Sequence, residues 1–213
     1  MYILLIQKVG ECVNINEIAK QVIVSKNGIA KASDLVSSGI SRQEIAKLNN
    51  SGYLTRICQG YYQLANKYEF SEEQLIAVTI PKGIISMESA LYHYAYSDFA
   101  PRKWSVTVPR NISRKMLNSS VVPLQVYYVQ DSLYELGKAH EVFNGVLLSV
   151  YDRERTICDC FKYRVKIDNE IFNKAINAYA NDEQKNLNNL SIYAKKLRVY
   201  KKVTELMEVL LNV

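Results

Sequence analysis

The chain has 213 residues, of which 48% are hydrophobic, and its 27 Lys and Arg against 21 Asp and Glu give a net charge of +6. This length and apolar content exclude a disordered chain and allow one large or two small globular domains. The basic excess favours a polyanionic partner, and the lack of a long apolar run excludes a membrane-spanning helix. We therefore expect a soluble, cytoplasmic protein.

The sequence offers little for metal or cofactor chemistry. Its four cysteines are scattered, and neither histidine lies near Cys158 and Cys160, so a zinc site with the usual ligand spacing is not expected. No Gly-rich phosphate loop or Ser-His-Asp arrangement is recognisable. We expect no metal, no cofactor and no enzymatic activity, and free thiols fit a reducing cytoplasm.

The first region reads as helix, short helix, turn, helix and hairpin. Apolar residues at helical spacing predict a helix over 15–23, opened by Asn14 or Asn16, and a shorter one over 31–38. Residues 1–9 could form an extra helix or a strand that pairs with the hairpin.

A capped helix followed at once by a two-stranded ribbon spans residues 39–64. Ser41 can cap the helix and Glu44 can return the cap, as in a capping box. Strand-like alternation over 53–58 and 61–64 surrounds a Gln59-Gly60 turn. A polar, basic helix joined to such a ribbon is typical of a winged helix-turn-helix, so residues 1–66 are predicted to form a DNA-binding domain.

Basic and polar side chains on this helix and ribbon are the candidate DNA contacts. The first turn of a recognition helix usually enters the major groove, where Arg pairs with guanine and Gln with adenine, and an arginine on a hairpin can enter a minor groove or hold a phosphate. Of the two neighbouring tyrosines on the return strand, Tyr62 is favoured as the core residue. A solvated helix face is the competing interpretation. The candidates are Lys31, Ser41, Arg42, Gln43, Lys47, Arg56, Gln59 and Tyr61.

The remaining residues, 67–213, predict a second domain in which strands are bracketed by helices. This gives the whole chain a two-domain α/β (α+β) fold, with a winged helix first and a mixed α/β domain with a helical C-terminus second. Helices are expected over 71–79, 86–96, 152–161, 169–179, 186–197 and 199–211, and strands over 104–108, 124–129 and 146–150.

Two basic stretches of the second domain contain no acidic residue. Residues 99–130 hold Arg102, Lys103, Arg110, Arg114 and Lys115. Charge runs are usually solvated faces, but two of them in an otherwise balanced domain lead us to expect that one extends the DNA contact. The candidates in the second stretch, residues 184–204, are Lys185, Lys195, Lys196, Arg198, Lys201 and Lys202.

The order of these motifs resembles the AbiEi-type antitoxins of bacterial abortive-infection systems. The resemblance covers roughly residues 15–165. In the first domain it rests on Gly39-Ile-Ser-Arg-Gln-Glu-Ile45, then Leu48, Gly52, Leu54, Arg56 and Gly60-Tyr61-Tyr62. In the second it rests on Asp152-Arg-Glu-Arg-Thr-Ile-Cys-Asp159, together with Ser89-Ala-Leu91, Pro101 and residues 104–109.

What this resemblance implies is a type IV antitoxin. Its winged helix would bind inverted repeats in the operator of its own operon and repress transcription. The C-terminal domain would counteract a nucleotidyltransferase-like toxin without a stable complex. Because operators of this kind are inverted repeats, we expect a monomer in solution and two copies on each operator.

Two alternatives belong to other functional classes. The protein could be an interaction module that docks directly on a partner toxin. It could also be a metal-dependent enzyme acting on nucleic acid or nucleotides, with Asp152, Glu154 and Asp159 as ligands. Against the enzyme, the spacing of Arg155 and Asp159 on a helix predicts a structural ion pair.

Overall fold

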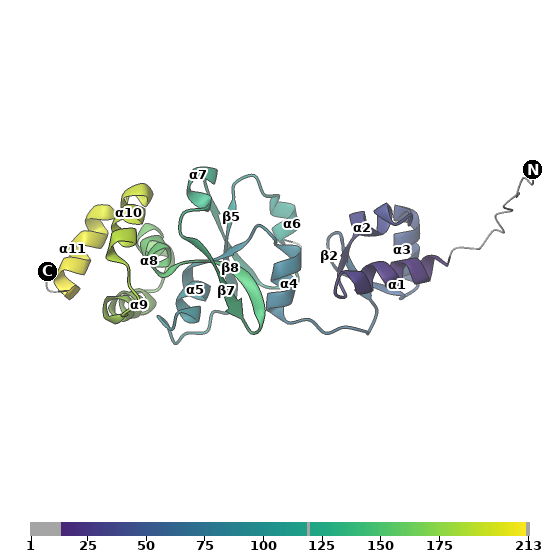
Figure 1. Cartoon of the computed structure of the whole chain (residues 1–213), viewed down its shortest axis with the longest axis horizontal. Coiled ribbons are helices and arrows are strands. Elements are labelled where there is room, and N and C mark those ends of the chain that lie inside the picture. The colour runs from purple at the N-terminus through teal and green to yellow at the C-terminus, as the bar shows by residue number, and fades with distance from the viewer. Residues whose placement is uncertain (1–13, 119, 212–213) are drawn as a thin grey trace, which may run out of the picture. The chain divides into compact units, whose positions relative to one another are not determined.

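Residues 14–118 and 120–211 are described by a computed structural model (Figure 1). The chain divides between Glu69 and Phe70 into two units, here called the first and second unit. The predicted two-domain α/β class is confirmed, because a small helical unit with a three-stranded sheet precedes a larger α/β unit with a helical C-terminus. The prediction for residues 1–9 falls outside the described residues.

The first unit has the winged-helix order. Its elements are α1 (Ile15–Ser25), β1 (Ala30–Lys31), α2 (Ala32–Ser37), α3 (Arg42–Asn50), β2 (Leu54–Cys58) and β3 (Tyr61–Leu64). The antiparallel sheet has the order β1-β3-β2, so the predicted ribbon gains a third strand from β1. In this strand Ala30 pairs with Tyr62 and Lys31 with Tyr61.

Local sequence signals place the ends of these helices. Asn14 caps α1 by accepting from the backbone N–H of Asn16 at 3.1 Å. Gly52 follows α3 with a φ of +75° and Gly60 occupies the ribbon turn with a φ of +82°, both in the left-handed region that favours glycine. Ile23 and Leu35 meet the inward face of α3 in one buried cluster.

The second unit is built around a mixed five-stranded sheet of order β6-β5-β4-β8-β7. Strands β5 and β6 are parallel, as are β4 and β8, while β4 with β5 and β7 with β8 are antiparallel. The elements are α4 (Glu72–Thr79), β4 (Ile84–Ile85), α5 (Met87–His93), β5 (Trp104–Pro109), α6 (Arg114–Asn118), β6 (Leu124–Val129), α7 (Asp131–Tyr134), β7 (Lys138–Phe143), β8 (Val146–Tyr151), α8 (Arg153–Lys162), η1 (Arg164–Lys166), α9 (Asn169–Asn181), α10 (Leu187–Leu197) and α11 (Tyr200–Leu211).

Helices cover both sides of this sheet. Within the second unit, α8–α11 gather on one side of the sheet and α4 and α6 on the other (Figure 1). Two buried clusters correspond to the two sides, one centred on the C-terminal helices and one on Val106, Val108 and Val150 of the strands.

The sequence patterns did not predict β4, α6 or α7, because a strand of two residues and helices of four or five carry too little periodicity to be recognised. They also did not predict the six-residue strand β7. The helix expected over 86–96 ends earlier, at His93.

Candidate nucleic-acid interface

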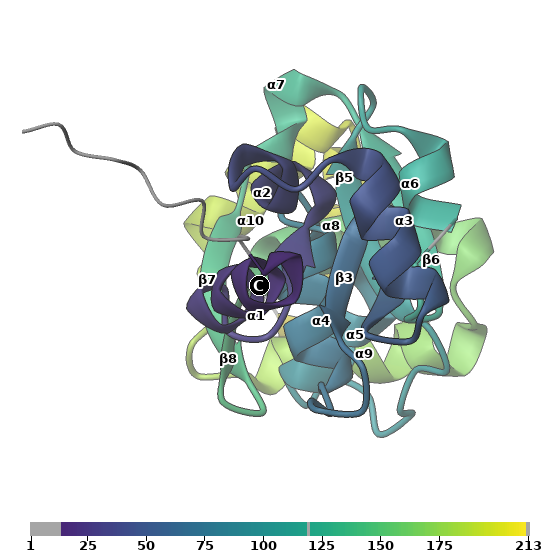
Figure 2. The same ribbon diagram turned by 90° about the vertical axis from the view of Figure 1, so that its right-hand side faces the viewer.

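Helices α2 and α3 are the two helices of the helix-turn-helix, and Figure 2 shows them joined by a short connection. Ile40 in this connection is buried, as are Ile45 and Leu48 on the inward side of α3. The opposite side of α3 exposes Arg42, Gln43 and Lys47. The predicted recognition surface is therefore present as a solvent-facing helix surface.

Ser41 and Glu44 form the predicted capping box at the start of α3. The Ser41 hydroxyl accepts from the Glu44 N–H at 3.2 Å, and the Glu44 carboxylate accepts from the Ser41 N–H at 2.7 Å. The Ser41 side-chain hydrogen bond holds the pKa of Glu44 below its usual value. The Ser41 hydroxyl accepts one hydrogen bond in the cap, so its O–H is still available to donate another.

The wing is tied to the recognition helix by a contact that the sequence patterns did not predict. The Asn49 side-chain oxygen accepts from the backbone N–H of Arg56 at 3.1 Å. The Arg56 guanidinium Nε donates to the Cys58 carbonyl at 3.2 Å, so this exposed side chain is steered along the ribbon. Gln59 is exposed at the turn of the ribbon. The hydrogen bond from Arg56 to Asn49 therefore fixes the wing relative to the recognition helix.

The prediction that Tyr61 is the exposed tyrosine is wrong. Its side chain is only 7% exposed, whereas Tyr62 is half-buried against the core of the first unit. The physical reason is that β3 is the central strand, so Tyr61 lies between cross-strand neighbours Lys31 and Cys58. The Lys31 ammonium lies 5.8 Å from the centre of the Tyr61 ring, which accounts for one side of this cover.

The cations of this surface form no salt bridge with the residues that the structure describes. In the described part of the chain, Lys31, Arg42, Lys47 and Arg56 form no salt bridge, while Lys20 on α1 pairs with Glu17. Unpaired cations on a braced helix and wing are available for phosphate neutralisation.

The basic candidates of the second unit gather where α10 meets α11. Lys195, Lys196, Arg198 and Lys202 are exposed there, and the Lys195 ammonium lies 4.8 Å from the Tyr200 ring centre. Exposed Lys201 forms a 3.8 Å ion pair with Glu205.

Lys185 differs from the other candidates of this stretch. It is half-buried, and its ammonium donates to the Asp182 carbonyl at 3.1 Å. The structure therefore places Lys185 apart from the exposed cations, because its ammonium is bound by its own loop.

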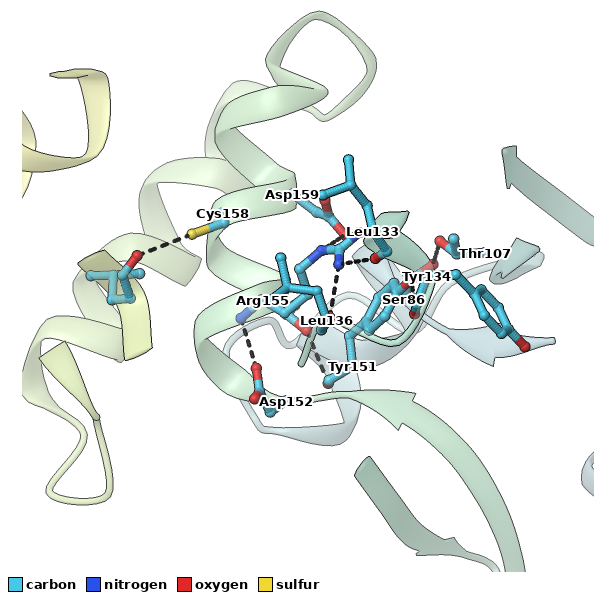
Figure 3. A network of polar contacts seen from close by, with 12 residues as sticks. Ser86, Thr107, Leu133, Tyr134, Leu136, Tyr151, Asp152, Arg155, Cys158 and Asp159 are labelled. Carbon is cyan, nitrogen blue, oxygen red and sulfur yellow. Dashed lines mark hydrogen bonds and ion pairs between the residues drawn. The ribbon is translucent and has the colours of Figure 1, made fainter. Parts of the chain in front are cut away.

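The motif of residues 152–159 forms a buried polar network (Figure 3). The predicted ion pair is confirmed: Arg155 Nε lies 3.1 Å from Asp159 Oδ2, and the two side chains are 1% and 2% exposed. Arg155 Nη1 also donates to the carbonyls of Leu133 at 2.8 Å and Leu136 at 2.7 Å. The guanidinium therefore anchors the segment around α7 to helix α8.

The neighbouring carboxylates of Asp152 and Glu154 accept hydrogen bonds from different donors. Asp152 caps α8 by accepting from the Arg155 N–H at 2.8 Å and also accepts from the Tyr193 hydroxyl at 3.1 Å. Glu154 accepts from the Tyr179 hydroxyl and from the backbone of Asn186. Among the described residues no group of three or more His, Cys, Asp or Glu could hold a metal ion. These carboxylates position helices α8, α9 and α10.

The stability of the second unit should depend on the ionisation of Asp152. Burial raises the pKa of Asp152 to about 6, above the unfolded value of about 4. The folded state therefore holds the proton more tightly, and the ionisation of Asp152 opposes folding as pH rises through this window. Relative to the wild type, Asp152→Asn should gain stability as the pH rises from about 4 to about 6 in urea unfolding, with little further change above that. A pH-independent difference between the two proteins would contradict this expectation.

Comparison with known proteins connects this geometry to a family. A family model described as "Transcriptional regulator, AbiEi antitoxin" matches residues 17–65. The crystal structure of the RV2827C protein from Mycobacterium tuberculosis shares the fold, with a TM-score of 0.61 at 12% identity, over 92% of this chain and 79% of that one. No curated protein matches the chain.

Among the described residues, no helix is both long and apolar enough to cross a membrane.

The matched segment covers α2, α3 and the wing and nearly all of α1. The resemblance inferred from the residue pattern is thus confirmed over residues 17–65, which are similar to the AbiEi antitoxin family of transcriptional regulators.

Proposed function

We propose that this protein is the antitoxin and transcriptional autorepressor of a type IV abortive-infection toxin–antitoxin operon. Residues 1–66 would bind operator DNA, and residues 67–213 would counteract a nucleotidyltransferase-like toxin. The observation that carries this proposal is the exposed, unpaired basic side of α3, braced to the wing by Asn49 within a segment that matches AbiEi regulators.

The geometry supports a division of labour in DNA binding. The first turn of α3 would enter the major groove, where Arg42 can pair with guanine and Gln43 with adenine. Lys47 and Lys31 would neutralise phosphates, and Arg56 with Gln59 would reach the backbone or a minor groove from the wing. Base contacts would give specificity, while the phosphate contacts would position the domain.

The exposed cations between α10 and α11 would lengthen this contact. Lys195, Lys196, Arg198 and Lys202 lie on a part of the second unit that is free of acids over residues 184–204. Lys201 and Lys185, which already have partners, would contribute less. Residues 154–159 of the motif are buried, so they would support the fold of the antitoxin domain rather than contact a toxin directly.

The test of this proposal measures DNA binding and antitoxicity in the same protein. In a mobility-shift series on the DNA upstream of its own gene, the full chain should bind with an affinity that falls steeply with salt. Two copies should occupy an inverted repeat, and the free protein should elute as a monomer. Expression of the chain should restore growth to cells carrying the toxin. Co-elution with the toxin would favour the docking alternative, and absence of promoter binding would refute the repressor.

A further inference from the structure

The second unit also contains a pocket lined by basic side chains, here called the hollow. Its volume is about 410 Å³, within the range of about 300–1,000 Å³ that small-molecule sites occupy. The polar side chains that line it are Arg110, Gln130, Ser132, Lys162, Lys196 and Arg198, with no carboxylate among them.

The four cations of this hollow come from three separate elements. Arg110 follows β5, Lys162 ends α8, Lys196 lies in the last turn of α10, and Arg198 caps that helix. None of them forms a salt bridge with a described residue. Lys162, Lys196 and Arg198 each lie at a helix C-terminus, where the partial negative charge of the helix stabilises a cation. This effect does not explain Arg110, nor why all four meet at one hollow.

The position in the sheet also favours a ligand. Arg110 and Gln130 directly follow the parallel strands β5 and β6, and the Arg110 N–H donates to the Val129 carbonyl at 3.2 Å. Ligands of open α/β sheets commonly bind outside the carboxyl ends of parallel strands. The facing wall around α7 is held in place by the buried guanidinium of Arg155 through the carbonyls of Leu133 and Leu136.

Two of the cations are in energetically unfavourable environments: the charge of Lys162 is partly buried, and the backbone of Arg198 is in the left-handed region. Lys162 is half-buried, and burial lowers its pKa; Asp159 opposes this effect, while the charges of Arg155 and Arg110 add to it. Arg198 has a φ of +61°, in the left-handed region that residues other than glycine seldom adopt at a helix end. A bound anion would offset the repulsion that Arg110 and Arg155 exert on Lys162.

We propose that this hollow binds a small polyphosphate, such as pyrophosphate or the phosphate chain of a nucleoside triphosphate, through Arg110, Lys162, Lys196 and Arg198. Leu133 and Leu197 complete the lining and offer an apolar contact to the remainder of the ligand. A small ligand can contact half-buried Lys162 together with exposed Arg110, Lys196 and Arg198, whereas a duplex backbone contacts mainly exposed cations. The site shares Lys196 and Arg198 with the DNA contact proposed for the second unit, but it does not depend on operator binding by the first unit.

Neighbouring lysines of α10 provide a matched pair of variants. Lys196 lines the hollow, while Lys195 is equally exposed, has the same charge and does not line it. Calorimetric titration of the full chain with pyrophosphate and with ATP, in metal-free buffer, should give saturable binding at one site, and adenosine should not bind. Lys196→Gln and Arg110→Gln should each weaken binding by about tenfold or more, and Lys195→Gln should leave it unchanged.

Three results would overturn this assignment. The first is the absence of saturable binding of both probes by the wild type. The second is an equal loss in Lys195→Gln and Lys196→Gln, which would indicate diffuse surface charge. The third is binding of a duplex oligonucleotide, sensitive to Lys196→Gln, without binding of either probe; that would assign the hollow to DNA. Unchanged Trp104 fluorescence in the variants would establish that they are folded.

Discussion

Replacing Arg155 with methionine should destabilise the second unit by about 3–5 kcal/mol, the effect expected when one partner of a buried ion pair is removed. Three contacts would be lost: the pair with Asp159 at 3.1 Å and the hydrogen bonds to the carbonyls of Leu133 and Leu136. Asp159 is already short of partners, because its Oδ1 has none among the described residues. The single tryptophan, Trp104, lies on β5, so urea unfolding followed by its fluorescence reports on this unit.

Arg153 provides the matched control for this prediction. It lies in the same turn of α8, pairs with Asp182 at 3.1 Å and is 30% exposed. Arg153→Met should cost no more than about 2 kcal/mol, because solvent screens the pair. Arg155→Met combined with Asp159→Leu should recover part of the loss, since no buried charge is then left unpaired. Equal effects of Arg153→Met and Arg155→Met would show that the buried network is not the anchor we describe.

Replacing Arg42 with alanine should weaken operator binding by about tenfold to a hundredfold, because a bidentate arginine–guanine pair provides about 1–3 kcal/mol of discrimination. The same change should alter binding to unrelated DNA much less. Arg56→Ala, if it removes a phosphate contact, should weaken binding to all sequences and lower the slope of log affinity against log salt by about one. Mobility shifts with operator and scrambled duplexes at several salt concentrations measure both effects.

Two variants serve as controls for the winged helix. Lys20→Gln removes an exposed cation of α1 that is paired with Glu17 and should leave operator binding unchanged. Ser41→Asp keeps a good helix cap but places a negative charge at the first turn of α3, so it should fold normally and bind poorly. Loss of binding in Lys20→Gln, or full binding in Arg42→Ala, would place the DNA elsewhere on the molecule.

The sequence alone predicted several interactions that join residues a few positions apart. The cap at Ser41 was predicted, and Asn14 was one of two candidates for the first helix, because a side-chain oxygen and an orphan N–H two or three residues later form a local signal. The Arg155–Asp159 pair follows from helical spacing in the same way. The order of these local elements was enough to indicate a winged helix and its family.

The tertiary structure decided every feature that joins distant parts of the chain. The burial of Tyr61 depends on β1 and β2 flanking the central strand, the sheet order depends on which strands pair, and the basic hollow draws cations from residues 110, 162, 196 and 198. Such contacts leave no periodicity in the sequence, because chain closure and packing of the whole domain determine which distant segments meet. Local hydrogen bonding therefore determined the elements of this protein, and long-range packing determined which charges became a surface and which became a pocket.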